Sequence, residues 1–237
     1  PDGGVAVRPF GGMKIERTWF AADKTGFHML HALFQTSLQY EPVKRYDEWF
    51  ATQLLVEDGR CLGVTAIELR TGQVRGIVAG AVIICTGGAG RMWPFTTNAA
   101  VKTGDGMAMA YSIGAELLGM EFVQFHPTGM VWPPSVRGTL VTEGVRGEGG
   151  VLTNSEGDRF MFRYIPELYQ ADTADTEDEA DRWAAGDRIN NRRPPELLTR
   201  DVVAKAIVSE AEAGRGSPHG GAFLNIAEKR DPDYIRA

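Results

Sequence analysis

The 237-residue sequence predicts a mixed α/β (α+β) fold built from two domains. One observation is a set of three strand-like runs, separated by turn dipeptides, in the first half of the chain. A second is that apolar residues recur at helical spacing in segments on both sides of these runs. A third is that long connections rich in Gly and Pro begin near Phe125. We therefore place a domain boundary there, with domains over residues 1–125 and 126–237.

The chain is expected to open with a loop followed by a helix. Residues 1–22 are rich in Gly and lack periodicity, which is typical of a loop. Apolar side chains from Phe27 to Leu38 then fall at helical spacing and predict a helix over residues 25–39. Asp23 stands where its carboxylate can cap the first turn of this helix.

The three strand-like runs predict an antiparallel meander. Asp58-Gly59 and Thr71-Gly72 separate them, and such dipeptides are typical of tight hairpin turns. The expected strands cover residues 51–56, 63–69 and 73–78.

A short apolar run follows the meander and leads into a turn rich in Gly. Residues 81–85 show no alternation, which predicts a strand buried on both faces, and residues 86–90 form the turn. Small residues at the carboxyl end of a parallel strand leave room for a cofactor, although a tight turn without any ligand fits the pattern equally well. A helix is expected from Asp105 to about Ala115, and Asp105 could either meet sugar hydroxyls or simply cap the helix.

The second half is expected to contain a surface insertion and a final helix. Residues 167–196 are first acidic and then basic, which indicates a solvated insertion with one short helix around Trp183. The last helix is predicted over residues 198–213.

Composition excludes several functional classes. A net charge of −6 and a pI near 5.3 argue against nucleic-acid binding. Cys61 and Cys85 lie at no metal-ligand spacing and suggest no disulfide framework, so we expect no metal site and a reducing compartment. No apolar run is long enough for a membrane span, so no direct membrane insertion is expected. The opening Pro1-Asp2-Gly3-Gly4, without an initiating Met, suggests part of a longer polypeptide.

Three further segments carry groups suited to chemistry. His126 lies in a stiff loop between Gln124 and Gly129, although a lone histidine is more often structural. Residues 142–150 place Thr, Glu and Arg among four glycines, which fits either a ligand-binding segment or a flexible surface hairpin. Arg200 opens the last helix, where the helix dipole disfavours a cation unless Asp201 compensates for it.

Together these segments resemble the flavoprotein subunits of succinate dehydrogenase and fumarate reductase, in order and separation, from about residue 8 to residue 215. Two of the motifs are Thr103-Gly104-Asp105-Gly106 and the run from Thr142 to Gly150. The matching stretches are residues 22–26, 86–91, 96–99, 103–106, 124–129, 140–150, 158–161 and 200–204.

The resemblance implies that residues 1–125 are part of an FAD-binding domain and that residues 126–237 are a capping domain holding the substrate, succinate or fumarate. By position, Arg200 would exchange a proton with the substrate, while Glu143 and Arg146 would relay it to solvent. The residues implied in binding are His126 and Thr142 for the substrate carboxylate, and Ala51, Thr86, Gly87, Thr96, Asn98 and Asp105 for FAD.

The resemblance also implies partners, namely an iron–sulfur subunit and membrane-anchor subunits, which would hold the protein peripherally at the cytoplasmic, inner face of the membrane. Two alternatives stay open: an enzyme similar to L-aspartate oxidase, and a non-catalytic fragment that keeps the fold. The sequence contains neither the GxGxxG dinucleotide motif nor a flavin-linking histidine motif. This chain by itself is therefore expected to bind FAD poorly and to be inactive.

Overall fold

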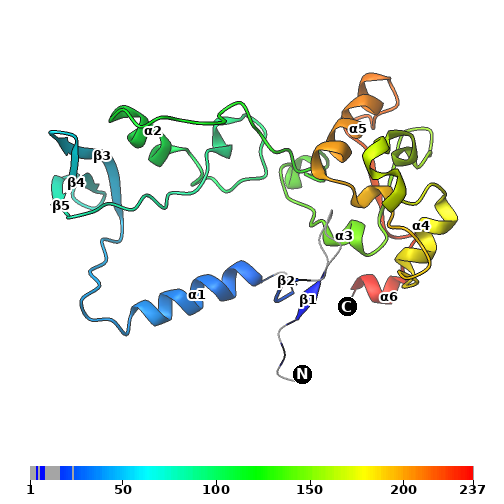
Figure 1. The fold of residues 1–237 in the computed structure, drawn as a ribbon, viewed down its shortest axis with the longest axis horizontal. Coiled ribbons are helices and arrows are strands. Elements are labelled where there is room, and N and C mark those ends of the chain that lie inside the picture. The colour runs from blue at the N-terminus through cyan, green and yellow to red at the C-terminus, as the bar shows by residue number, and fades with distance from the viewer. Residues whose placement is uncertain (1–3, 5, 9–16, 23, 237) are drawn as a thin grey trace. The chain divides into compact units, whose positions relative to one another are not determined.

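A computed structural model describes residues 4, 6–8, 17–22 and 24–236 (Figure 1). The chain divides into two compact units, and each is described here by itself. One unit comprises residues 26–122, and the other comprises residues 1–25 together with 123–237. The predicted cap at Asp23 lies outside the described residues.

The predicted helix and meander are both confirmed. Helix α1 spans Thr25–Ser37, and the strands β3 (Trp49–Glu57), β4 (Arg60–Glu68) and β5 (Val74–Val78) form one antiparallel sheet in the order β3-β4-β5. The turn between β3 and β4 contains Asp58 at φ 47° and Gly59 at φ 72°. Positive φ at both central residues is what a two-residue hairpin turn needs, so the Asp-Gly dipeptide sets this connection.

The expected buried strand at residues 81–85 is wrong. This segment is irregular and largely exposed, and Ile83 is 85% exposed. A strand exists only with a hydrogen-bonded neighbour, and within the described part of the chain no segment pairs with these residues. After the short 3₁₀ helix η1 (Gly90–Met92), helix α2 begins at Asp105 as predicted and ends at Ser112, where Gly114 at φ 90° turns the chain away.

The other unit combines many short elements with one long helix. Two-residue strands β1 (Val7–Arg8) and β2 (Thr18–Trp19) pair antiparallel, so residues 1–22 are not wholly a loop as expected. Strand β6 (Val151–Thr153) pairs antiparallel with β7 (Phe223–Asn225). The helical elements are η2 (Pro134–Val136), α3 (Gly144–Gly147), η3 (Phe160–Tyr164), η4 (Glu167–Asp172), α4 (Glu177–Ala184), η5 (Pro195–Leu197), α5 (Arg200–Glu212) and α6 (Pro232–Arg236).

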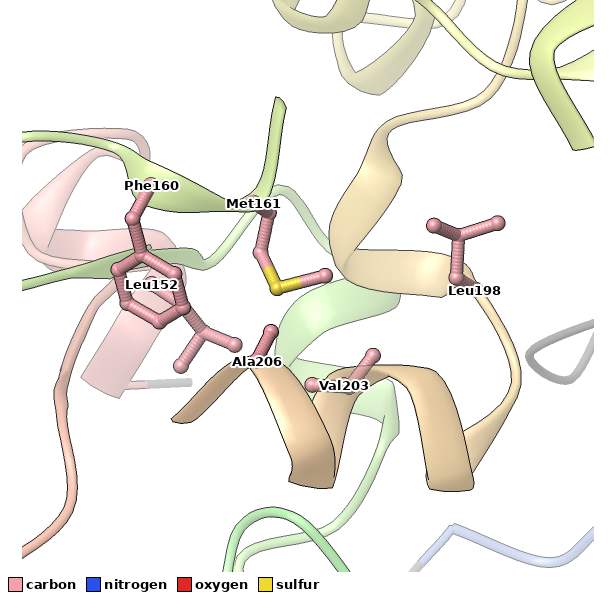
Figure 2. Packing of buried hydrophobic residues seen from close by; sticks show 6 residues of the cluster. All are labelled: Leu152, Phe160, Met161, Leu198, Val203 and Ala206. Carbon is pink, nitrogen blue, oxygen red and sulfur yellow. The ribbon is translucent and has the colours of Figure 1, made fainter. Parts of the chain in front are cut away.

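A small apolar core fixes α5. Val203 and Ala206 lie on the same side of this helix and face Met161 of η3 (Figure 2). All three side chains are at most 1% exposed. The remaining members of the cluster are Leu152, Phe160 and Leu198. Because this packing immobilises α5, it also fixes the backbone of Arg200, the first residue of the helix.

The segment 167–196 is largely exposed, as the charge pattern indicated, but parts of it are buried. It contains the predicted short helix, α4, whose N-cap residue Thr176 accepts a hydrogen bond from the backbone of Glu179. However, Ala174 and Ala180 are fully buried, and Arg192 binds the Glu179 carboxylate through two nitrogens at 2.8 Å. The bonds of Arg192 tie two parts of the segment together, and Asp181 attaches it to the rest of the unit by accepting from Arg159 at 2.9 Å and from Lys229 at 2.7 Å.

Among the described residues, no helix has both the length and the apolar character needed to cross a bilayer.

Candidate active site

Residues 142–150 form a compact turn rather than the flexible hairpin that was one alternative. The Thr142 hydroxyl accepts a hydrogen bond from the backbone N–H of Gly144 at 3.3 Å, and α3 follows. The chain then doubles back so closely that a Cβ on Gly150 would lie 2.7 Å from the carbonyl oxygen of Val145. One turn of helix separates Glu143 from Arg146, so their side chains can meet.

Two arginines flank the carboxylate of Glu143. Arg200 Nε lies 3.4 Å from Glu143 Oε2, and Arg146 Nη2 lies 3.6 Å from the same oxygen. The side chains of Glu143 and Arg146 are almost fully buried, whereas that of Arg200 is 34% exposed. The structure thus brings together the three residues to which the family resemblance assigned proton transfer, in the order Arg200, Glu143, Arg146.

Arg146 holds its charge in an unfavourable place. Its Nη1 donates to the backbone carbonyl of Glu196, while Nε and Nη2 have no hydrogen-bond partner among the described residues. Burial lowers the pKa of Arg146, and the neighbouring charge of Arg200 lowers it further, whereas Glu143 and Glu196 raise it. A buried cation with incomplete hydrogen bonding is costly, which favours a functional role for it.

His126 lies in the same electrostatic environment. Burial lowers the pKa of His126, as do the charges of Arg200 and Arg146, while Glu143 opposes them. The imidazole is therefore neutral near pH 7. Its Nδ1 accepts from the backbone N–H of Thr128 at 3.3 Å, which assigns the ring proton to Nε2. Nε2 is then a donor available for a carboxylate oxygen.

Gln124 is a site residue that the sequence reasoning missed. Its Oε1 accepts a hydrogen bond from Arg200 Nη1 at 3.0 Å. Gln124 stands two positions before His126, within the matching stretch 124–129, and its place in that stretch could have indicated that it belongs to the site. Thr142, the other residue expected to bind substrate, is exposed and directly precedes Glu143 in the chain.

In the unit of residues 26–122, the turn rich in Gly gathers most of the residues expected to contact FAD. A Cβ on Gly106 would lie 2.1 Å from Thr86 Oγ1, and a Cβ on Gly90 would lie 2.5 Å from the Asn98 side chain. Only glycine at positions 90 and 106 lets the backbone come this close to Thr86 and Asn98, because any other residue would add a Cβ that overlaps their side chains.

The remaining expected contacts lie on the same elements. Gly87 follows Thr86 with φ 76°, and the Thr96 hydroxyl accepts from the backbone N–H of Asn98 at 3.1 Å. Ala51 lies on β3, which contacts α2, the helix that Asp105 begins. A turn of small residues with an acidic side chain at a helix start fits a dinucleotide cofactor, because backbone can approach phosphate and a carboxylate can accept from sugar hydroxyls.

Comparisons with known proteins agree with these features. The family described as FAD binding domain matches residues 1–237. The chain is 53% identical over 222 residues to the fumarate reductase flavoprotein subunit of Mycobacterium tuberculosis, covering 93% of this chain and 34% of that protein. It is 57% identical over 164 residues to the fumarate reductase flavoprotein subunit of Escherichia coli K12, covering 69% of this chain and 27% of that protein.

Solved structures show the same relationship. The quinol fumarate reductase of Escherichia coli superposes with a TM-score of 0.81 at 46% identity, covering 95% of this chain and 36% of that one. Sdh1 of Mycobacterium smegmatis, in complex with UQ1, superposes with a TM-score of 0.67 at 39% identity, covering 99% of this chain and 36% of that one. The chain therefore spans about a third of the length of the relatives it matches. Because the family match extends over the whole chain, the chain, which is similar to the flavoprotein subunits of fumarate reductase, belongs to the FAD binding domain family.

Proposed function

We propose that this protein is the flavoprotein subunit of a fumarate reductase or succinate dehydrogenase, and that it interconverts fumarate and succinate with FAD as its cofactor. The observation that carries the proposal is the Glu143 carboxylate, placed 3.4 Å from Arg200 and 3.6 Å from the buried Arg146. This arrangement suits the proton half of such a reaction.

Reduction of a carbon–carbon double bond adds a hydride to one carbon and a proton to the other. FAD, when bound, supplies the hydride. Arg200 gives its proton to the second carbon, which requires explanation because free arginine keeps its proton up to about pH 12. The transfer becomes feasible if the guanidinium is reprotonated at once, and the Glu143 carboxylate lies close enough to both arginines to take a proton from Arg146 and pass it to Arg200. Solvent would then return a proton to Arg146, so that all three residues regain their starting protonation.

The substrate's carboxylates need donors, and the chain provides two. His126 offers Nε2–H from a neutral ring, and Thr142 offers its exposed hydroxyl. Gln124 contributes differently, because its bond to Arg200 Nη1 restricts the direction in which the guanidinium points. Orientation of this kind matters for rate, since displacement of a catalytic group by about 1 Å can cost about a hundredfold.

The same proposal assigns roles to the two predicted domains and to partners. Residues 1–125 would form part of the FAD-binding domain, with Ala51, Thr86, Gly87, Thr96, Asn98 and Asp105 beside the cofactor, and residues 126–237 would form the capping domain. An iron–sulfur subunit and membrane-anchor subunits would hold the protein at the cytoplasmic face of the membrane. The relatives named as quinol fumarate reductases support this part of the proposal.

The substrate class is tested with the full-length protein loaded with FAD. Fumarate should oxidise a reduced viologen dye, and succinate should reduce an oxidised dye, while L-aspartate should give no reaction. Turnover with L-aspartate and none with succinate would instead favour the alternative of an L-aspartate oxidase. No reaction with any of the three would favour a chain that keeps the fold without this activity.

A further inference from the structure

A second buried carboxylate lies beside the array of Arg200, Glu143 and Arg146. Glu196 is 0% exposed, and its two carboxylate oxygens accept from Arg159 Nε at 2.7 Å and from Arg159 Nη2 at 3.0 Å. Such a two-point contact between a guanidinium and a carboxylate fixes orientation as well as charge.

Glu196 also holds Arg146, through a different atom. Its backbone carbonyl accepts from Arg146 Nη1, the one hydrogen bond that the structure gives this guanidinium among the described residues. Glu196 belongs to η5, which packs against α3 and ends only three residues before Arg200. Glu196 is therefore bonded to Arg146, the most buried residue of the array, and also belongs to the segment that leads into Arg200.

We propose that Glu196 is a positioning residue for proton transfer: its carboxylate, held by Arg159, fixes the carbonyl that places Arg146 against Glu143. This inference rests on the proposed function. The sequence around Glu196 gives no indication of this role. Fifty positions separate Glu196 from Arg146 in the chain, so only the fold brings them together.

Further contacts of Arg159 hold it in place against Glu196. Arg159 Nη1 donates to Asp181 Oδ1 at 2.9 Å, and Asp181 Oδ2 accepts from Lys229 at 2.7 Å. Burial acts to lower the pKa of Arg159, but its bonds and charge interactions with Glu196 and Asp181 outweigh burial and raise it. Arg159 thus stays charged, and the Glu196 carboxylate keeps its partner.

The charge of Glu196 gives the proposal a second consequence. Four groups interact with the guanidinium of Arg146: Glu143 and Glu196 raise its pKa, Arg200 lowers it, and the neutral ring of His126 lies in the same field. Removing the charge of Glu196 takes away one of the two favourable neighbours. The pKa of Arg146 should then fall, and the alkaline limb of kcat should move to lower pH.

The chain offers a closely matched control in Glu210. It is 1% exposed and also accepts two bonds from one arginine, from Arg215 Nε at 2.8 Å and from Nη2 at 2.9 Å. It lies ten residues after Arg200 on the same helix, about 15 Å along its axis. Glu210→Gln therefore makes the same chemical change in an equally buried setting, without touching Arg146.

The experiment compares Glu196→Gln and Glu210→Gln in the full-length protein loaded with FAD, measuring kcat and KM for fumarate from neutral to alkaline pH. Glu196→Gln should lower kcat about tenfold with KM within about twofold, and should shift the alkaline limb to lower pH. Glu210→Gln should keep the wild-type kcat and limb. Equal losses in both variants, or wild-type kcat in Glu196→Gln, would overturn the positioning role.

Arg159→Lys serves where Glu196→Gln does not fold. It keeps a cation beside Glu196 but removes the two-point contact, so kcat should fall about fivefold with the alkaline limb unmoved. Wild-type kcat in this variant also overturns the proposal. A wild-type protein that reduces no fumarate overturns the proposed function itself, whereas an active wild type with indistinguishable Glu196 and Glu210 variants overturns the positioning role alone.

Discussion

Glu143→Gln removes the negative charge between two guanidiniums and leaves the side-chain volume nearly unchanged. At about 3.5 Å, each attraction amounts to about 5 kcal/mol at an effective dielectric constant of about 20, before desolvation is subtracted. Arg146, only 1% exposed, would keep its charge without a carboxylate at 3.6 Å. Losing one partner of a buried pair costs about 3–5 kcal/mol, and the exposure of Arg200 places the loss near the lower value.

The same change should affect turnover more than folding. An amide cannot pass a proton to Arg200, and general acid–base groups contribute about 10²–10⁴-fold to rate. We expect kcat for fumarate reduction by the full-length protein to fall about 10²-fold or more, with FAD still bound. Urea unfolding, followed by tryptophan fluorescence, measures the stability change, and dye oxidation measures kcat.

A matched control exists in the same turn. Glu148 is the C-cap residue of α3 and pairs at the surface with Arg230 at 3.3 Å, and its side chain is 51% exposed. Glu148→Gln should change stability by less than about 1 kcal/mol and should leave kcat unchanged. A kcat for Glu143→Gln within tenfold of that of Glu148→Gln would refute the assignment of Glu143 to proton transfer.

Two further predictions concern the cofactor turn and acid stability. Gly106→Ala in the full-length protein should reduce FAD content severalfold, because the added Cβ would lie 2.1 Å from Thr86 Oγ1. Flavin absorbance per mole of purified protein measures this content. An unchanged content would contradict the assignment of the turn at residues 86–90 to FAD binding. The Glu210 carboxylate has its pKa lowered to about 2, chiefly by Arg215, so its stabilising effect is full above its unfolded pKa near 4.5 and declines as pH falls towards 2. The difference in urea midpoint between wild type and Glu210→Gln should therefore shrink from pH 6 to pH 3, and a constant difference would contradict the ion-pair origin.

Local pattern was sufficient for elements that depend on neighbouring residues. The spacing of apolar side chains predicts α1, and the Asp58-Gly59 dipeptide predicts the first hairpin of the meander, because both features are set within a few residues. The run at residues 81–85 fails for the opposite reason. An apolar segment becomes a strand only beside another strand, and that partner cannot be read from the segment itself.

The site shows the same division. Residues 142–150 admitted a flexible hairpin because nothing in that stretch indicates that Glu143 meets Arg200, 57 positions later in the chain. Glu196 gave no signal at all, since its charge belongs to a segment that composition alone assigns to the solvated surface. Local sequence contains the donors and acceptors, whereas the packing of η5 against α3 and of α5 against η3 decides which of them meet.

The most direct test of the central claim is the turnover of Arg200→Lys in the full-length protein, measured together with its FAD content. Lysine keeps a positive charge but has a shorter reach and lacks the forked guanidinium that contacts both Glu143 and Gln124. We predict that FAD stays bound at the wild-type level while fumarate reduction and succinate oxidation are both abolished. Near-normal turnover in this variant would contradict the account, because the proton would then have to reach the substrate by another route.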